Sequence, residues 1–81
     1  MAQHQVLSPL PGIFYRQPSP EKPPYKQDGD RVAEGDIIGL IEVMKQFTEV
    51  HADASGKIVR FLIDNEAAVE PGQAVLLIET A

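Results

Sequence analysis

Apolar residues gather in short runs along this chain, and turn-forming residues separate the runs from one another. The runs are rich in β-branched and aromatic residues, which favour extended strands over helices. No segment keeps an apolar helical period over about ten residues, so the pattern predicts an all-β fold. The expected strands are residues 13–16, 37–43, 47–51, 57–63 and 74–79.

Two segments lie outside this pattern. Residues 1–5 are polar and are expected to form an N-terminal tail, so that the folded domain spans residues 6–80. Residues 17–25 contain four prolines. Because proline has no backbone N–H to donate to a sheet, this segment cannot be a central strand and is expected to form a stiff loop.

The chain also contains an internal repeat. Residues 32–42 match residues 69–79 at an offset of 37, and residues 12–16 match residues 56–60 at an offset of 44. Two similar halves predict interleaved β-units related by a pseudo-twofold axis, neither of which can bury its apolar face alone. The two offsets differ by 7, so the first half carries extra residues, and the proline-rich segment 17–25 is the expected insertion.

A lysine lies where the two halves meet. Residues 42–46 read Glu-Val-Met-Lys-Gln and separate two of the expected strands. A tight hairpin turn needs positive φ and usually contains Asn-Gly or Asp-Gly, whereas Met44 and Lys45 each cost about 1–2 kcal/mol in that conformation. A position where the residues contradict the preference of their local structure is often a functional site. We therefore expect Lys45 to be held out for modification by an enzyme; the alternative is an ordinary exposed turn lysine.

Composition narrows the possible functions. The chain has 81 residues, enough for one domain, and a net charge of -5 with no basic cluster, which argues against binding to nucleic acid or anionic membranes and favours a protein partner. It has no cysteine, which excludes disulfides, thiolate metal sites and cysteine nucleophiles. His4 and His51 are isolated and no catalytic constellation can be assembled, so we predict no catalytic residue and no metal ligand. No run is long enough to span a bilayer and no signal peptide is recognisable, so a cytoplasmic or organellar location is expected.

Several of these segments together resemble one family. Residues 8–16, the loop 18–20 and residues 42–45 are similar to the biotinyl domains of biotin carboxyl carrier proteins, which serve bacterial and plastid-type acetyl-CoA carboxylases. The resemblance runs from residue 6 to residue 79. It implies a flattened β-barrel, a sandwich of two small antiparallel sheets, in which residues 17–25 form a thumb-like insertion near the biotin.

The resemblance also implies a carrier function. Lys45, in the hairpin of residues 43–46, would receive biotin covalently from a biotin protein ligase. The biotin would carry carboxylate from a biotin carboxylase to a carboxyltransferase, for acetyl-CoA carboxylation in fatty-acid synthesis in bacterial cytoplasm or plastid stroma; the carrier itself would not be catalytic. The residues expected to form the turn and to be recognised by the ligase are Glu42, Val43, Met44 and Gln46. The thumb residues expected near the biotin are Pro18, Ser19, Pro20 and Tyr25.

The motif departs from the usual pattern of the family, which reads Glu-Ala-Met-Lys-Met. Gln46 places a polar amide where an apolar neighbour of the lysine is usual. Two other functions stay open. A lipoyl carrier shares the duplicated barrel, although lipoyl domains favour Asp-Lys-Ala at the turn and lack the thumb. An unmodified barrel could serve as a protein-interaction module, with Gln46 as the sign of lost modification.

Overall fold

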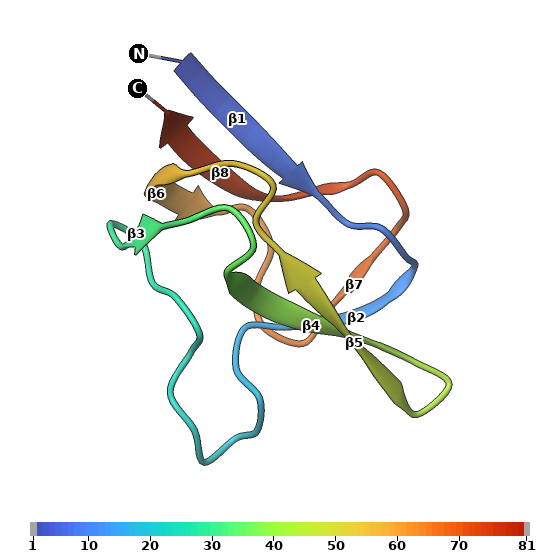
Figure 1. The fold of residues 1–81 in the computed structure, drawn as a ribbon. Coiled ribbons are helices and arrows are strands. Elements are labelled where there is room, and N and C mark those ends of the chain that lie inside the picture. Colours follow the sequence, from blue (N-terminus) through green and yellow to red (C-terminus); the bar gives the residue numbers. More distant parts are fainter. Residues whose placement is uncertain (1, 81) are drawn as a thin grey trace.

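The computed structural model describes residues 2–80, which form strands joined by turns and loops (Figure 1). None of these residues is helical, which confirms the expected all-β class. The strands in chain order are β1 (Ala2–Leu7), β2 (Gly12–Tyr15), β3 (Arg31–Val32), β4 (Ile37–Val43), β5 (Gln46–His51), β6 (Gly56–Phe61), β7 (Ala67–Val69) and β8 (Ala74–Thr80).

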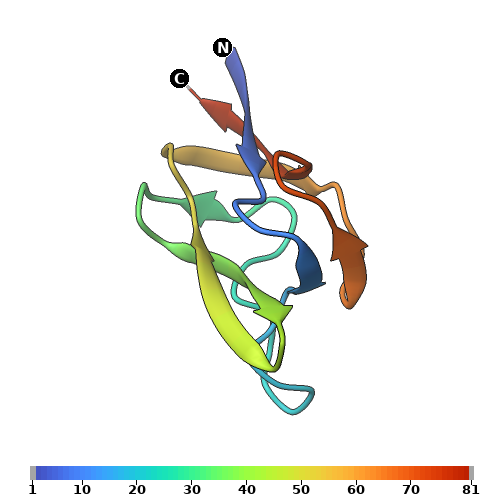
Figure 2. The same ribbon diagram turned by 90° about the vertical axis from the view of Figure 1, so that its right-hand side faces the viewer.

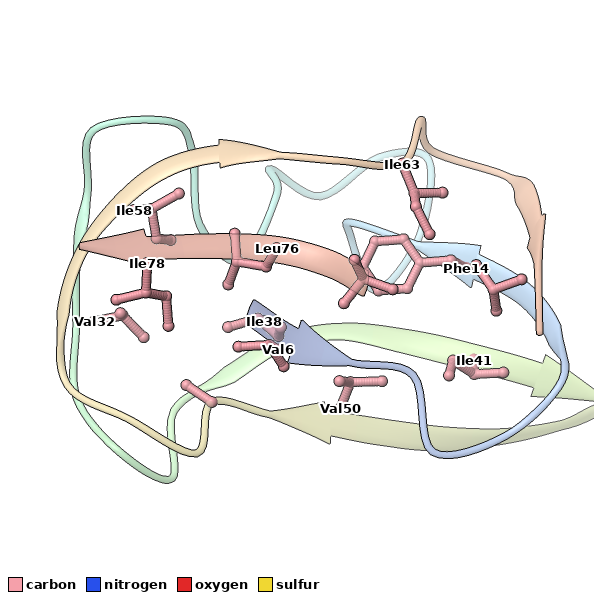
Figure 3. Close-up of a cluster of buried hydrophobic side chains, with 13 residues drawn as sticks. Val6, Phe14, Val32, Ile38, Ile41, Val50, Ile58, Ile63, Leu76 and Ile78 are labelled. Atoms are coloured by element: carbon pink, nitrogen blue, oxygen red, sulfur yellow. The ribbon is translucent and has the colours of Figure 1, made fainter. Parts of the chain in front are cut away.

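The strands form two four-stranded antiparallel sheets, one in the order β1-β8-β6-β3 and the other in the order β5-β4-β2-β7. The molecule measures 38 × 27 × 19 Å, so the barrel is flattened, as expected. Apolar side chains from both sheets meet between them (Figure 3). The buried core consists of Val6, Phe14, Val32, Ile38, Ile41, Val50, Ala52, Ile58, Ile63, Val69, Val75, Leu76 and Ile78.

The internal repeat appears in the structure as a pseudo-twofold relation between the two sheets. Val43 at the end of β4 pairs with Gln46 at the start of β5. At the positions related by the two offsets, Thr80 pairs with Ala2. The Met44–Lys45 turn of one sheet therefore corresponds to the gap between the chain termini in the other. Figures 1 and 2 show both termini at the end of the molecule away from the tip of the β4–β5 hairpin.

The relation extends to the backbone hydrogen bonds of two turns that lead into β4 and β8. Gly35, at φ 95°, donates its N–H to the carbonyl of Ala52 over 2.8 Å. Its counterpart Gly72, at φ 83°, donates to the carbonyl of Ser8 over 2.8 Å. The two interleaved halves are therefore built in the same way at the level of single hydrogen bonds.

The two halves fill equivalent core positions with different side chains. Phe14 in β2 corresponds to Ile58 in β6, and Gly39 in β4 corresponds to Leu76 in β8. A Cβ atom on Gly39 would lie 2.6 Å from the Phe14 ring, so the glycine leaves room for the aromatic side chain. In the other half the smaller Ile58 leaves room for Leu76, which keeps the interior densely packed on both sides.

The expectation of an N-terminal tail over residues 1–5 is wrong for residues 2–5. They belong to β1, which pairs with β8 along its length at the edge of its sheet. Their side chains are exposed or half-buried, and Val6 is the first buried residue of the strand. An edge strand held mainly by backbone hydrogen bonds carries polar side chains, so its sequence looks like that of a tail. Met1 lies outside the described residues.

Strand β4 has the bounds that the sequence predicts, and the other expected strands lie within a few residues of theirs. The strand expected over 57–63 ends at Phe61, because the chain bends at residues 62–63 before the connection to β7. The short strands β3 and β7 were not expected. Each is too short to show an alternating pattern and depends on a neighbouring strand for its hydrogen bonds.

The connection between β2 and β3 is much longer than its counterpart in the second half. It takes residues 16–30, whereas the connection between β6 and β7 takes residues 62–66. The long connection includes the proline-rich segment 17–25. It extends away from the sheets on the side opposite the termini (Figures 1 and 2), and its role as a thumb stays a prediction.

Candidate functional site

The turn between β4 and β5 contains two residues. Because Val43 pairs with Gln46, Met44 and Lys45 alone reverse the chain, with φ angles of 52° and 65°. Positive φ at both positions is what a tight hairpin turn matched to strand twist requires. Two ordinary L-residues therefore occupy a strained conformation here, as the sequence predicts. Met44 is 91% exposed and Lys45 is exposed, so the lysine is accessible at the tip of the hairpin.

The two residues that flank the turn have different surroundings. Val43 is half-buried and packs against the core, whereas Gln46 is exposed. The polar amide of Gln46 therefore remains in contact with water and costs the fold no buried hydrogen bond. A protein that approaches the turn would meet this exposed amide directly.

Glu42 lies in the second pair behind the turn, opposite Phe47 in the register of β4 and β5. Its Oε1 accepts a hydrogen bond of 2.7 Å from the hydroxyl of Tyr15 in β2. The rings of Tyr15 and Phe47 pack in a tilted arrangement with centroids 6.0 Å apart, a geometry that stabilises aromatic pairs. These three side chains connect β2 with both strands of the hairpin.

The surroundings of Tyr15 are negatively charged. The hydrogen bond to Glu42 raises the pKa of Tyr15, and burial and the negative charges of Glu42 and Glu66 raise it further, because a phenolate would lie beside two carboxylates. Among residues 2–80, no basic side chain forms an ion pair with Glu42 or Glu66. The carboxylates beside Tyr15 are therefore not neutralised by an ion pair within the described residues.

A pocket of about 410 Å³ lies next to this cluster. Among the residues that line it are Tyr15, Pro18, Ser19, Pro20, Phe47 and Glu66. The structure thus brings the first part of the predicted thumb together with the hairpin. Tyr25 does not line the pocket; its backbone N–H donates to the carbonyl of Arg16 over 2.9 Å and closes the base of the loop.

The sequence does not single out two residues of this pocket. Phe47 is 58% exposed, which is unusual for a phenylalanine. The sequence places it in an expected strand and gives no sign of this exposure. Glu66 lies in the short connection between β6 and β7 at φ 68°. The one signal for Glu66 is the repeat, because the offset of 37 matches it to Gly29, a residue type that readily adopts positive φ.

Comparison with known proteins identifies the family. The model of the biotin/lipoyl family, described as "Biotin-requiring enzyme", matches residues 4–78. The chain belongs to this biotin/lipoyl family. Its predicted resemblance to biotinyl domains and its predicted fold class are thereby confirmed.

Relatives of this biotin/lipoyl domain carry a common name, biotin carboxyl carrier protein of acetyl-CoA carboxylase. The Nostoc sp. protein is 37% identical over 93% of this chain and 41% of its own length. The Streptococcus pyogenes protein is 42% identical over 91% of this chain and 45% of its own length. A chloroplastic relative from Glycine max is 36% identical over 91% of this chain. The chain thus spans less than half the length of these relatives.

A solved structure shares the fold. The Kluyveromyces lactis urea carboxylase superposes with a TM-score of 0.77 at 30% identity, over 98% of this chain and 6% of the enzyme. The biotin/lipoyl domain described here therefore has the fold of a small part of a large carboxylase. Its described residues contain no helix with the length and apolar character needed to cross a membrane.

Proposed function

We propose that the chain is the biotin carrier of an acyl-CoA carboxylase that acts on acetyl-CoA, and that Lys45 holds the biotin in an amide bond. The observation that carries the proposal is an exposed lysine in a two-residue turn of positive φ, at the midpoint of a duplicated barrel. The names of the relatives support the choice of biotin and of acetyl-CoA carboxylase.

The residues near the turn fit a biotin group. Lys45 offers a primary amine that no ion pair engages among residues 2–80. The neighbouring pocket has aromatic and proline walls and the polar Ser19, a mixture suited to a small ring system that carries a few hydrogen-bonding atoms. When bound, biotin would supply the ureido nitrogen that carries carboxylate between two active sites.

The chain contributes presentation rather than catalysis. The anchored hairpin holds the backbone of the turn in place, so that Lys45 is exposed at a fixed point of the molecule. A free lysine amine is protonated at neutral pH, so a base of the ligase must accept a proton before the nitrogen can attack. The ligase would supply biotin as an acyl-adenylate, and the Lys45 nitrogen would attack its carbonyl carbon, so that the amide bond forms as the bond to AMP breaks and AMP leaves. A tethered group then has a high effective concentration at each active site that the arm can reach.

The partners that follow from this proposal are a biotin protein ligase, a biotin carboxylase and a carboxyltransferase. Fatty-acid synthesis in bacterial cytoplasm or plastid stroma is the setting, in line with the bacterial and chloroplastic relatives. Glu42, Val43, Met44 and Gln46 would be the residues around Lys45 that the ligase recognises.

The proposal assigns the loop 17–25 the role of a thumb that restrains the arm between visits to the two enzymes. Its four prolines lower the entropy that the loop loses when it stays ordered. Pro18, Ser19 and Pro20 line the pocket beside the hairpin. Deletion of the loop should increase the mobility of the biotin ring in NMR relaxation measurements. Unchanged mobility would remove this part of the proposal.

Intact mass after co-expression with a biotin protein ligase tests the main proposal. We expect a gain of one biotin that is absent in Lys45→Ala and retained in Lys57→Ala, which removes another exposed lysine from β6. A lipoyl increment from a lipoyl-attaching enzyme would favour a lipoyl carrier. No increment with a competent ligase would favour an unmodified interaction module.

A further inference from the structure

The pocket beside the hairpin is lined by aromatic rings, prolines, neutral polar side chains and one carboxylate. The rings of Tyr15 and Phe47 and the prolines at positions 18 and 20 supply its apolar surface, and Glu66 lines it as well. Phe47 is 58% exposed and the nearby Met44 is 91% exposed. This much apolar side chain beside a single turn is typical of a surface that another protein covers.

Glu66 occupies a position that the other half of the fold gives to glycine. It has φ 68°, and its N–H donates to the carbonyl of Phe14 over 2.7 Å. Its pseudo-twofold counterpart Gly29 has φ 89°, and its N–H donates to the carbonyl of Ile58 over 2.8 Å. The two backbones are equivalent, so the fold needs positive φ here but does not need a carboxylate. The carboxylate of Glu66 is therefore free to interact with a partner without a cost to the fold.

The charge of this surface defines what it can receive. Glu42 accepts a hydrogen bond of 2.7 Å from the Tyr15 hydroxyl, and Glu66 lines the same pocket as Tyr15. No basic side chain among residues 2–80 forms an ion pair with either carboxylate. An arginine or lysine side chain fits such a surface well, because its stem can pack on the aromatic rings while its charged end meets the carboxylates.

The position of the pocket indicates which partner brings that side chain. An enzyme that modifies Lys45 must enclose the lysine side chain itself, so its surface has to cover the turn and the strand positions directly behind it. Phe47 and Glu42 form the second pair behind the Met44–Lys45 turn. Enzymes that act on the far end of a long biotin arm do not need to approach so closely.

We propose that Glu66, with Glu42 and the rings of Tyr15 and Phe47, forms the docking surface for a basic side chain of the biotin protein ligase. The inference rests on the proposed biotin carrier function. It adds a residue outside the lysine motif, supplied by the loop between β6 and β7. Because the ligase meets the chain before biotin is attached, this docking does not compete with a biotin ring for the pocket.

The test measures steady-state biotinylation of the full chain by a purified ligase at low and high salt. Glu66→Gln should raise KM about three- to tenfold at low salt with little change in kcat, and the effect should shrink as salt rises. Glu66→Lys should raise KM further. Glu66→Gly should raise KM as Glu66→Gln does, and it should unfold at a higher temperature than the wild type because glycine readily adopts positive φ. A higher KM in a more stable variant would show that docking is lost while folding is not.

Glu34→Gln is the matched control, because it removes the same charge from an exposed residue near the opposite end of the hairpin. It should change KM less than about twofold. Equal effects of Glu34→Gln and Glu66→Gln would overturn the inference in favour of general charge steering, and wild-type kinetics in Glu66→Gln would overturn it outright. If ligase kinetics stay unchanged while biotin attachment shifts the Glu66 amide signal in NMR spectra, the occupant is the biotin ring and the inference fails. A wild-type chain that accepts no biotin would refute the carrier function itself.

Discussion

The hydroxyl of Tyr15 donates a 2.7 Å hydrogen bond to Oε1 of Glu42, and this bond joins β2 to the strand that leads into the Met44–Lys45 turn. Phe47, on the other strand of the hairpin, packs its ring 6.0 Å from the ring of Tyr15. Both strands of the hairpin are therefore anchored to β2 by side chains on one face. An anchored hairpin directs its tip consistently, which is what a carrier lysine requires of its scaffold.

This relationship predicts the titration of Tyr15. Its pKa should lie above the usual value for tyrosine, and Glu42→Gln should lower it, because the mutation removes a carboxylate beside the phenol. Since the pKa is raised in the folded state, the stability gained is complete below the pKa of an unfolded tyrosine and is lost as the pH rises through the folded-state value. NMR titration of the Tyr15 ring, with Tyr25 followed in the same spectra, measures the shift. The same Tyr15 pKa in Glu42→Gln and wild type would contradict the prediction.

The turn should show a conflict between stability and function. Replacing Met44 by Asn and Lys45 by Gly supplies residues that tolerate positive φ, so the free energy of unfolding should rise by about 1–2 kcal/mol. The same variant should accept no biotin, because the amine is gone. Thr48→Gly, a glycine placed within β5 of the same hairpin, should instead lower stability by about 0.5–1 kcal/mol. Urea denaturation measures the expected gain in stability of the turn variant and the expected loss in Thr48→Gly. A loss of stability in the turn variant would show that the native turn is not strained.

Substitution of either of two equivalent glycines, Gly12 and Gly56, should destabilise the fold, because a Cβ at each would meet the backbone of a neighbouring strand. A Cβ on Gly56 would meet the carbonyl oxygen of Glu79, and a Cβ on Gly12 would meet that of Glu42. Paired backbones cannot separate without loss of hydrogen bonds, so Gly56→Ala and Gly12→Ala should each cost about 2 kcal/mol or more. Gly29→Ala has no atom within 4 Å of its Cβ, and its φ of 89° alone should cost about 1 kcal/mol. Thermal unfolding of the three variants compares them directly, and equal losses would argue against backbone contact as the cause.

The complementary sizes of Phe14 and Gly39 can be tested by a double-mutant cycle. Gly39→Ala should destabilise the wild type by about 1–3 kcal/mol, because its Cβ meets the aromatic ring at 2.6 Å. In a Phe14→Leu background the same substitution should cost at least about 0.5 kcal/mol less. The rescue should be partial, since the carbonyl oxygen of Tyr15 lies 2.8 Å from the same Cβ. Additive effects in chemical denaturation would mean that the ring is not what excludes a side chain at Gly39.

Much of this protein could be predicted from its sequence because the relevant signals are local. Strand β4, residues 37–43, is mostly apolar and is bounded by turns, and its bounds are as predicted. The repeat predicted two equivalent halves, and the strained turn at Met44 and Lys45 followed from the absence of Asn or Gly between two strands. In each case the residues whose pattern allows the prediction are the same residues that form the strand, the repeat or the turn.

Features that depend on distant residues were decided by the tertiary structure. Residues 2–5 form a strand only because β8 offers a free edge for backbone hydrogen bonds, and their polar side chains give no sign of it. Phe47 and Glu66 are far apart in the chain, and the folding of both sheets brings them to one pocket. The sequence alone determined where the lysine is presented. The tertiary structure decided what surrounds it, because that surface is assembled from strands and a loop that have no contact until the barrel closes.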